Sequence, residues 1–485
     1  MIRIDLLEKL WPHITATLAL LLTFFGICHV AINKKDSRAA VGWAGIIFLF
    51  PYVGAFLYLV FGINRIKRKA SELRNKSIRS FRARNANTRS VKGLENILPE
   101  ESKHLIMLEK LVSNVTRHPL ASNNSLEILL NGDEAYPAMI NAIEKANYSI
   151  SLATFIFAKD TAGKMFIDSL SKAVKRGVQV RVLIDDVGSR FSFVPVFNQL
   201  RKHGITARKF MPTMLPWRAK YMNLRNHKKI LVVDGKTGFT GGMNIALHNM
   251  LLKKPGHPVQ DVHFRVTGPV VTHLQETFAE DWLFVSKEEL QGKSWFPKQQ
   301  QTGTLIARGI TDGPDEDFEK LQNIIMGALS CARRTVRILT PYFLPEPALM
   351  DALKVTAMRG VEVDIIVPER GNHRLVAWAS AGQFDQLLEK GCRIWLSSPP
   401  FDHSKIMIVD DFWSLIGSAN WDPRSLRLNF EFNVECYSKE MAESLNAVFD
   451  KKQQNARQLN LENVNSWPLA IKLRNGLCRL FLPYL

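Results

Sequence analysis

The sequence predicts an α/β protein in which two tandem copies of one unit follow an N-terminal hydrophobic helical hairpin. Three observations support this prediction: two long uncharged stretches near the N-terminus, a strand–helix–strand–helix order that occurs twice, and a His-x-Lys-x4-Asp motif that also occurs twice. Alternating strands and helices favour a mainly parallel sheet flanked by helices. We expect the copies to be related by a pseudo-two-fold axis, and their interface is a natural place for an active site.

The N-terminal segment, residues 1–64, contains two apolar stretches that are each long enough to cross a membrane. Residues 14–32 and 41–63 carry no formal charge, and about 20 helical residues span a hydrocarbon core of roughly 30 Å. A cleaved signal peptide is the alternative for the first stretch. Its apolar part is long for a signal peptide, and the second stretch would remain unexplained, so we expect a retained membrane hairpin.

Residues 65–122 are expected to be a basic juxtamembrane linker. Between residues 65 and 92, eleven Lys and Arg are opposed only by Glu72. By the positive-inside rule this end of the hairpin, and the chain after it, should be cytoplasmic and lie against anionic headgroups; a solvated linker is the plainer alternative. The hairpin loop also carries Lys34, Lys35 and Arg38, which face outward against the rule if both stretches span. A re-entrant hairpin would avoid that conflict.

The whole-chain composition points to an anionic partner and a reducing environment. Lys and Arg number 64 against 45 Asp and Glu, a formal charge of +19 with a pI near 9.7, so either nucleic acid or an anionic membrane is indicated. The five cysteines are widely spaced and include no Cys-x-x-Cys pair. Neither a zinc cage nor a disulfide framework is therefore suggested, which favours a catalytic region facing the cytosol.

The rest of the chain repeats one unit, in residues 123–300 and 301–460. The junction KRGVQVRVLID of the first copy matches MRGVEVDIIVP of the second almost position for position. The expected strands are 149–157 and 178–185 in the first copy and 336–343 and 361–368 in the second, with helices at 163–176 and 348–359. The tail, residues 461–485, mixes apolar and basic residues and is expected to be an interfacial helix or a docked extension.

Each copy contains the same motif, followed at equal spacing by a small-residue corner and an asparagine. The catalytic candidates are His227, Lys229, Asp234, His403, Lys405 and Asp410, and the candidates for binding the substrate phosphate are Gly242, Asn244, Ser418 and Asn420. His and Lys alternate along an extended strand, so both point to one face. Asp234 and Asp410 close the motif, and we interpret them as residues that fix the hairpin and pair charges.

These residue types suit the transfer of a phosphodiester. Lysine offers a compact positive charge to the non-bridging oxygens, and the asparagines and corner N–H groups add neutral donors. Histidine can act as a nucleophile or as a general acid near neutral pH. With one histidine from each copy, one can attack phosphorus while the other protonates the departing oxygen.

An imidazole nucleophile needs an acceptor on its second nitrogen. We propose Asp261 and Glu431, which follow the first and second motif, as the residues that orient the histidines. His263 and Glu435 are rivals for this role, because they lie within a few residues of the same positions.

The motifs resemble those of the phospholipase D superfamily, and the match is closer to its bacterial cardiolipin synthases. The segments that carry the resemblance are GWAGIIFLFPYVGAFLYLVFG, NLRNHKKILVVDGKTGFTGG, TPYFLPEPAL, HSKIMIVDD and GSANWDPRSLRLNFE. The resemblance implies two phospholipase D-like repeats in a bacterial inner membrane enzyme that needs no metal or other cofactor. It implies transfer between two phosphatidylglycerol molecules to give cardiolipin and glycerol. A phosphohistidine would form on His227, with His403 as the acid, or with the two roles exchanged.

Departures from the family pattern leave the headgroup open. Val259-Gln260 replaces a usual Trp-Arg before Asp261, and Asp402 and Trp421 stand where other residues are common. A different donor or acceptor and a hydrolytic phospholipase D are therefore alternatives. A nuclease of the superfamily would need neither the hydrophobic pair nor the basic run, so we expect no nucleic acid partner. A membrane scaffold would not need two complete motifs, and the pattern makes no prediction of oligomeric state.

Overall fold

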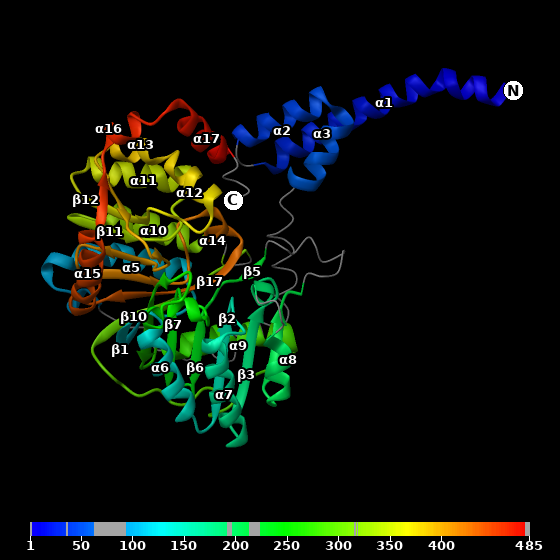
Figure 1. Cartoon of the computed structure of the whole chain (residues 1–485). Helices are drawn as coiled ribbons and strands as arrows, with labels where there is room; N and C mark the ends of the chain where they lie inside the picture. Colours follow the sequence, from blue (N-terminus) through cyan, green and yellow to red (C-terminus); the bar gives the residue numbers. More distant parts are fainter. Residues whose placement is uncertain are drawn as a thin grey trace. The chain divides into compact units, whose positions relative to one another are not determined.

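The computed structural model describes residues 2–34, 37–62, 94–191, 196–212, 224–314, 317 and 319–480. The chain divides into two units, Met1–Lys69 and Ala70–Leu485, which are coloured along the sequence in Figure 1. The basic run at 65–92 lies largely outside the described residues, so its predicted membrane contact remains a prediction.

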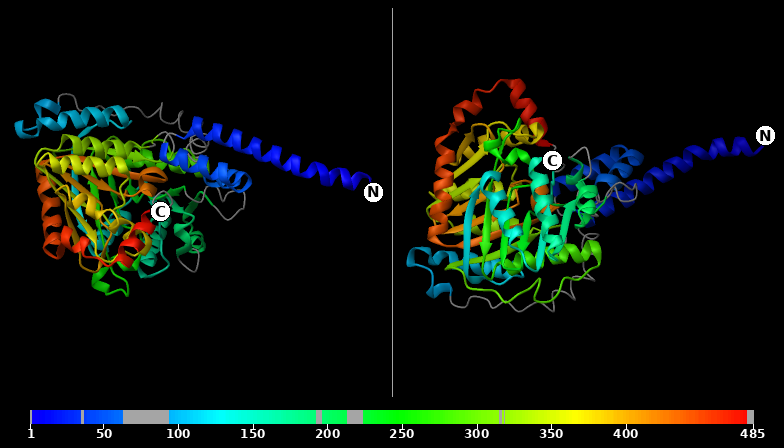
Figure 2. Two further views of the ribbon diagram at one scale, coloured as in Figure 1. Left: turned by 90° about the horizontal axis from the view of Figure 1, so that it is seen from above. Right: turned by 60° about the horizontal axis from the view of Figure 1, so that its bottom comes forward.

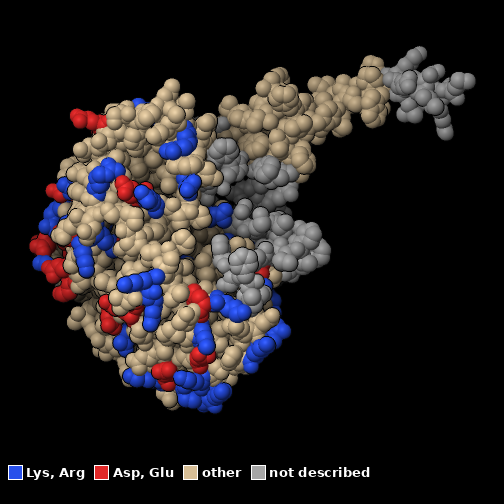
Figure 3. Space-filling model, viewed as in Figure 1, with Lys and Arg blue, Asp and Glu red and all other residues tan. Residues whose placement is uncertain are grey.

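The N-terminal unit contains one long helix and a pair of short ones. These are α1 (Ile2–Asn33), α2 (Ser37–Leu49), α3 (Pro51–Leu57) and the π-helical turn η1 (Tyr58–Gly62). Residues Leu10–Asn33 of α1 are long and apolar enough to cross a membrane, and the visible surface of these helices carries almost no charge (Figure 3).

The second apolar stretch is not a single spanning helix. α2 ends at Leu49, and Pro51, which lacks a backbone N–H, begins α3. The chain turns so sharply here that a Cβ on Gly54 would lie 2.5 Å from the Ile46 carbonyl oxygen. This return agrees with the re-entrant alternative and not with two full spans.

The second unit is built on one long mixed sheet. Its strands are β1 (Ala121–Leu130), β2 (Ser149–Thr154), β3 (Gln179–Asp185), β4 (Thr206–Phe210), β5 (Arg225–Asn226), β6 (Ile230–Val233), β7 (Thr237–Gly241), β9 (Val262–Thr267), β10 (Leu305–Asp312), β11 (Thr335–Leu339), β12 (Glu362–Pro368), β13 (Arg393–Ser397), β15 (Ile406–Val409), β16 (Trp413–Gly417), β17 (Asn429–Tyr437) and β18 (Ala456–Leu459). The strand order is β18-β13-β12-β11-β15-β16-β17-β10-β1-β9-β7-β6-β2-β3-β4, and β5 pairs with β17. A separate two-stranded sheet pairs β8 (Val259–Gln260) with β14 (Phe401–Asp402).

Helices cover both faces of this sheet (Figures 1 and 2). The longer ones are α5 (Ile106–Val115), α6 (Asn131–Glu144), α7 (Thr161–Lys175), α8 (Val196–Lys202), α9 (Val271–Ser286), α10 (Lys320–Cys331), α11 (Pro347–Met358), α12 (Arg374–Ala381), α15 (Lys439–Gln454) and α17 (Leu469–Leu480), and the shorter ones are α13 (Phe384–Leu388), α14 (Pro423–Arg427) and α16 (Leu461–Asn465). They bury one large apolar core in each half of the sheet.

The strand order confirms the predicted duplication. From the centre outward, β1-β9-β7-β6-β2-β3-β4 in the first half corresponds to β10-β17-β16-β15-β11-β12-β13 in the second. The two central strands, β1 and β10, are equivalent and pair antiparallel. Antiparallel pairing of equivalent strands is the relation that a two-fold axis produces, so the repeats are related by pseudo-two-fold symmetry.

The prediction of a mainly parallel sheet was wrong in one respect. Only the pairs within β2-β3-β4 and β11-β12-β13, and the short β5 with β17, run parallel in the main sheet. The strands that follow each His motif form a hairpin and then return once more, as β6-β7-β9 and β15-β16-β17, and such strands run antiparallel. Apart from the short β5–β17 pair, the parallel part is therefore limited to the strands joined by helices.

The predicted linker and tail also belong partly to this unit. Leu98, Leu105 and Leu108, within the expected linker 65–122, are buried in the core of the second repeat, and α5 packs on α10. At the other end β18 adds an edge strand to β13, and α17 packs on α12.

Candidate active site

Each motif histidine is held at the seam between the repeats. The short strand β5 before His227 pairs with β17 of the second repeat, and β14 before His403 pairs with β8 of the first. The His227 N–H donates to the Phe430 carbonyl at 2.9 Å, and the His403 N–H donates to the Gln260 carbonyl at 2.8 Å. The backbone of each motif is thus anchored on the opposite repeat.

The two orienting carboxylates are also exchanged between the repeats. His227 Nδ1 lies 3.0 Å from Glu431 Oε1, and His403 Nδ1 lies 2.9 Å from Asp261 Oδ2. The sequence indicated both carboxylates, but their crossed pairing follows only from the way the repeats interlock.

The rival orienting residues face elsewhere. Glu435 accepts from Arg308 Nε at 2.5 Å and from Trp413 Nε1 at 3.0 Å. His263 packs against Gly241, where an added Cβ would lie 2.7 Å from its Nδ1. Neither is bonded to a motif histidine.

Gly242 and Ser418, which are predicted to bind phosphate, lie against the orienting carboxylates. A Cβ on Gly242 would lie 2.6 Å from Asp261 Oδ1, so glycine leaves room for this carboxylate. Ser418 Oγ donates to Glu431 Oε2 at 2.5 Å, and the Ser418 N–H donates to the Phe432 carbonyl. The structure therefore gives Ser418 a supporting role for Glu431, because its donors are already used within the protein.

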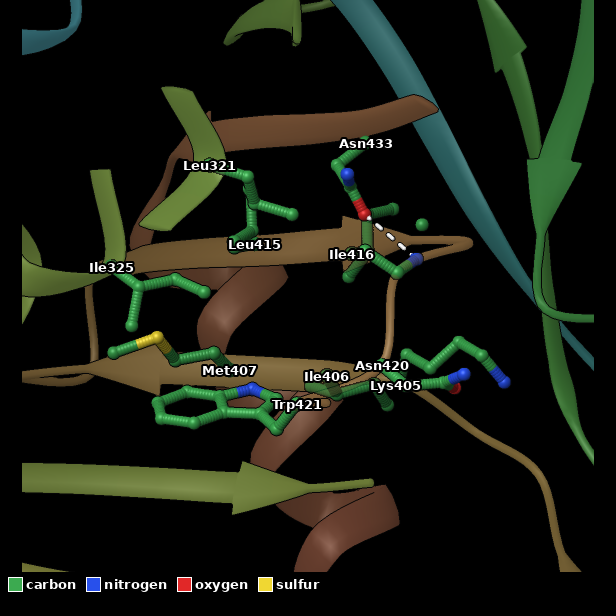
Figure 4. Close-up of a pocket in the computed structure, with 12 residues that line it drawn as sticks. Leu321, Ile325, Lys405, Ile406, Met407, Leu415, Ile416, Asn420, Trp421 and Asn433 are labelled. Carbon is green, nitrogen blue, oxygen red and sulfur yellow. Dashed lines mark hydrogen bonds between the residues drawn. The ribbon is translucent and has the colours of Figure 1, made fainter. Parts of the chain in front are cut away.

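The motif lysines are buried beside the histidines. Lys229 Nζ donates to the His227 carbonyl at 2.6 Å, and Lys405 Nζ donates to the His403 carbonyl at 2.5 Å. Figure 4 shows Lys405 and Asn420 side by side at one end of the β15–β16 hairpin, where apolar side chains fill the space behind them. Asn420 Nδ2 donates to Ser425 Oγ, and Asn244 Oδ1 accepts from the Ile156 N–H.

Burial controls the charge of this site. It lowers the pKa of Lys229 to about 7 and that of Lys405 to about 8, and it lowers the pKa of His227 and, more strongly, of His403 below the ordinary value. The charge of Lys405 also lowers the pKa of His227, and that of Lys229 lowers the pKa of His403. The four groups therefore act on one another across the seam, and both imidazoles are neutral in the free protein.

The pKa values of the two carboxylates are shifted in opposite directions. Burial raises the pKa of Asp261 to about 6. Burial alone would also raise the pKa of Glu431, but its interaction with His227, which includes a hydrogen bond, and the charge of Lys229 lower this pKa below the ordinary value. Glu431 is thus the firmly ionised partner, and the two halves of the site are not electrostatically equivalent.

Aromatic rings that the sequence reading missed border the histidines. The Phe155 ring centroid lies 5.3 Å from that of His227, and the Tyr342 centroid lies 6.2 Å from that of His403. Both residues follow equivalent strands, β2 and β11, at their carboxyl ends. They do not occupy matching positions, because Thr154 bonds to the carbonyl of Ile156 where Thr340 bonds to that of Tyr342. The signal that could have identified them is an aromatic residue shortly after each of two equivalent strands.

The unusual Asp402 belongs to a buried ion pair. It accepts from Lys452 Nζ and from Ser404 Oγ. In the first repeat Lys228 Nζ lies 2.8 Å from Asp281. There the basic residue is next to the motif histidine and the acidic residue is on helix α9, whereas in the second repeat the acidic Asp402 is next to the histidine and the basic Lys452 is on helix α15. The departure from the family pattern at Asp402 is therefore part of the scaffold behind His403.

Asp234 and Asp410 lie at the other end of the hairpins from the histidines. Asp234 accepts from the N–H groups of Asn147, Tyr148 and Ser149, and Asp410 accepts from three equivalent N–H groups at residues 333–335. Asp410 also contacts His104 Nε2 at 2.6 Å. Both side chains thus tie the hairpin to the start of the neighbouring strand, which is the hairpin-fixing role that the sequence suggested.

We expect Asp234→Asn and Asp410→Asn to reduce stability more than catalysis. A charged acceptor of several backbone N–H groups is lost in each, so the free energy of unfolding should fall by about 1–3 kcal/mol. Thermal unfolding in detergent measures the change, with exposed Asp168→Asn as the control. A large loss of activity in fully folded protein would contradict the structural role.

Comparison with known proteins agrees with this geometry. The family described as "Cardiolipin synthase, PLD-like domain" matches residues 139–282 and 325–453, and a phospholipase D-nuclease N-terminal family matches residues 21–62. The major cardiolipin synthase of Bacillus subtilis is 30% identical over 482 residues, covering 96% of this chain and 99% of that protein. A cardiolipin synthase of Geobacillus is 31% identical over 462 residues, covering 94% of this chain and 91% of that protein.

A solved structure supports the fold. The phosphatidylserine synthase of Haemophilus influenzae superimposes with a TM-score of 0.62 at 17% identity, covering 78% of this chain and all of that chain. The duplicated sheet, the two motifs at its seam and the matches along nearly the whole chain together place this chain in the cardiolipin synthase family of phospholipase D-like proteins.

Proposed function

We propose that this chain is a cardiolipin synthase that transfers a phosphatidyl group from one phosphatidylglycerol molecule to another. The observation that carries the proposal is the crossed arrangement of two histidines, each with a carboxylate from the opposite repeat, beside two buried lysines. Two imidazoles can divide the work of nucleophile and acid, and the lysines can hold the charge of a phosphodiester.

In the first step, Nε2 of neutral His227 attacks the phosphorus of phosphatidylglycerol. The bond from phosphorus to the glycerol oxygen breaks, and protonated His403 gives its proton to that oxygen, so that glycerol leaves. Glu431 accepts from Nδ1–H of His227 and stabilises the positive charge that develops on the ring. Burial disfavours the protonated form of His403 in the free protein, and the bound anionic phosphodiester would raise its pKa.

In the second step, neutral His403 takes a proton from a hydroxyl of the second phosphatidylglycerol. The resulting oxygen attacks phosphorus, the bond from phosphorus to Nε2 of His227 breaks, and cardiolipin is released. One phosphodiester replaces another, so no nucleotide or metal is needed. Asn244 and Asn420 are proposed to donate to the non-bridging oxygens.

The proposed location is the inner membrane of a bacterium, with the catalytic unit on the cytoplasmic side. The apolar helix α1 supports anchoring in a membrane, and the basic run at 65–92 supports the cytoplasmic orientation through the positive-inside rule. Protease digestion of right-side-out and inverted vesicles tests it, because only inverted vesicles should expose the catalytic unit.

The decisive experiment supplies purified full-length protein with phosphatidylglycerol in mixed micelles and separates the products. Cardiolipin and glycerol in equal amounts would support transfer. Phosphatidic acid without cardiolipin would show hydrolysis and overturn the proposal. Adding phosphatidylethanolamine as an alternative acceptor or donor defines the headgroup preference.

The lysines give a pH dependence whose direction can be stated. An amine with a lowered pKa is charged only below that pKa, so kcat/KM should fall as the pH rises through about 7, where Lys229 loses its proton. Lys229→Arg keeps its charge throughout this range, and the midpoint should then move to about 8, set by Lys405. Lys405→Arg is the matched control and should leave the midpoint near 7. Equal midpoints in both variants would contradict this assignment.

A further inference from the structure

The C-terminal helix α17 is firmly docked on α12 through one of its faces. Asn475 is 2% exposed, Arg474 stacks over the Trp378 ring at 4.5 Å, and Arg479 donates to the Gly382 carbonyl at 3.2 Å. The helix is therefore a fixed part of the catalytic unit (Figure 1).

The opposite face of α17 exposes a row of leucines. The exposed fractions are 71% for Leu469, 57% for Leu473, 58% for Leu477 and 69% for Leu480, and Leu375 of α12 is 55% exposed. Residues four and three positions apart lie on one side of a helix, so the four leucines form one apolar row. Burying them would remove much apolar area from water.

The charges beside this row are positive. α17 contains Lys472, Arg474 and Arg479 and no acidic residue, and α12 begins with Arg374 and likewise contains none. An amphipathic helix with a leucine face and basic flanks is suited to the interface of an anionic bilayer. A second copy of the same surface would bring like charges together, which argues against self-association through it.

The same helices line a cavity that reaches Tyr342, whose ring neighbours His403. It has a volume of about 750 Å³, and its lining includes Trp378, Trp467 and Ile471 together with the basic Arg374 and Arg457. Tyr342 also lines it, and this residue contacts His403. A bilayer against α17 would therefore lie next to a cavity whose lining includes the aromatic neighbour of a catalytic histidine.

We propose that α17 and the start of α12 form a docking surface through which the catalytic unit lies on an anionic phospholipid bilayer. The leucine row enters the interfacial region, and the exposed Lys472 and Arg374 contact the headgroups. This contact is separate from the N-terminal helices, and it does not depend on the proposed reaction.

Spin labels test the contact directly in the full-length chain. The three cysteines that are only partly buried are first removed as Cys28→Ser, Cys331→Ser and Cys478→Ser. A label is then placed through Leu477→Cys or, as the control, Met358→Cys. Met358 is 66% exposed and is the last residue of α11. The protein is reconstituted in vesicles of phosphatidylglycerol and phosphatidylcholine.

The label at residue 477 should be accessible to oxygen and shielded from a water-soluble nickel complex, and the label at 358 should show the reverse. Accessibility to the nickel complex at both positions would overturn the proposal. Shielding of residue 477 from both reagents would also overturn it, because this would indicate a protein partner such as a second copy.

Paired variants test the functional consequence. Leu473→Glu with Leu477→Glu should raise KM for phosphatidylglycerol in vesicles by about tenfold or more, while kcat/KM for a short-chain monomeric phosphatidylglycerol stays unchanged. Val355→Glu with Met358→Glu is the matched control, since these residues are 54% and 66% exposed on α11, and it should change neither value. Failure of the proposed function would appear as absent turnover in the unaltered chain, and the spin labels would still decide on docking.

Discussion

Replacing His227 or His403 with alanine is expected to lower the turnover of phosphatidylglycerol by about 10⁴-fold or more, because each removes a group that no neighbour can replace. Product formation in mixed micelles measures the loss. Vesicle binding should be unchanged, since neither residue belongs to the apolar N-terminal helices or to the leucine row. Near-normal turnover in either variant would refute the paired-histidine mechanism.

An activated substrate separates the two roles. A phosphatidyl ester of p-nitrophenol has a leaving group that needs no proton, so only the nucleophile is required to release it. If His227 is the nucleophile, His403→Ala should still release a burst of p-nitrophenol equal to the number of active sites, and His227→Ala should release none. The reverse pattern would exchange the two assignments.

The second large effect concerns the crossed carboxylates. We expect Glu431→Gln and Asp261→Asn each to lower turnover by about 10²- to 10⁴-fold, because the amide cannot hold the imidazole in the same tautomer or stabilise its charge. Because each carboxylate orients the histidine of the other repeat, each variant should have the same kinetic defect as loss of that histidine. Glu431→Gln should therefore weaken the p-nitrophenol burst as His227→Ala does, whereas Asp261→Asn should preserve it as His403→Ala does.

A buried carboxylate outside the site provides the control for this comparison. Glu435→Gln alters a carboxylate that accepts hydrogen bonds from Arg308 and Trp413. It should lower stability without slowing one of the two chemical steps more than the other. If Asp261→Asn abolished the burst and Glu431→Gln retained it, the pairing would follow the chain and not the crossed geometry.

Much of the site was readable from spacing alone. His227 and Lys229 recur as His403 and Lys405 at equal offsets, and chemistry explains why these residue types belong together. Asp261 and Glu431 were identified as carboxylates that follow each motif. The histidine that each carboxylate binds was not identified, because hydrogen bonds between the repeats depend on how β5 and β14 pair across the seam. The spacing of residues along the sequence gives no information about that pairing.

Other differences have local causes. Hydrophobic content predicted the second apolar stretch as membrane-associated, but the turn at Pro51 and the close approach at Gly54 divide it. Ser418 looked like a phosphate donor because small residues often present their N–H groups, yet its N–H donates to the Phe432 carbonyl and its hydroxyl donates to Glu431. The ion pair of Asp402 with Lys452 joins residues far apart in the sequence, so composition could not reveal it.

The exchange of carboxylates means that neither repeat holds a complete catalytic set. A gene fragment encoding either half alone would produce an imidazole without its acceptor, and activity would return only when both halves are expressed together. Two identical halves could complete one another as a homodimer, but here the reversed charges at Lys228–Asp281 and Asp402–Lys452 have made the halves distinct. Within one polypeptide the two halves can therefore differ while the active site still needs both of them.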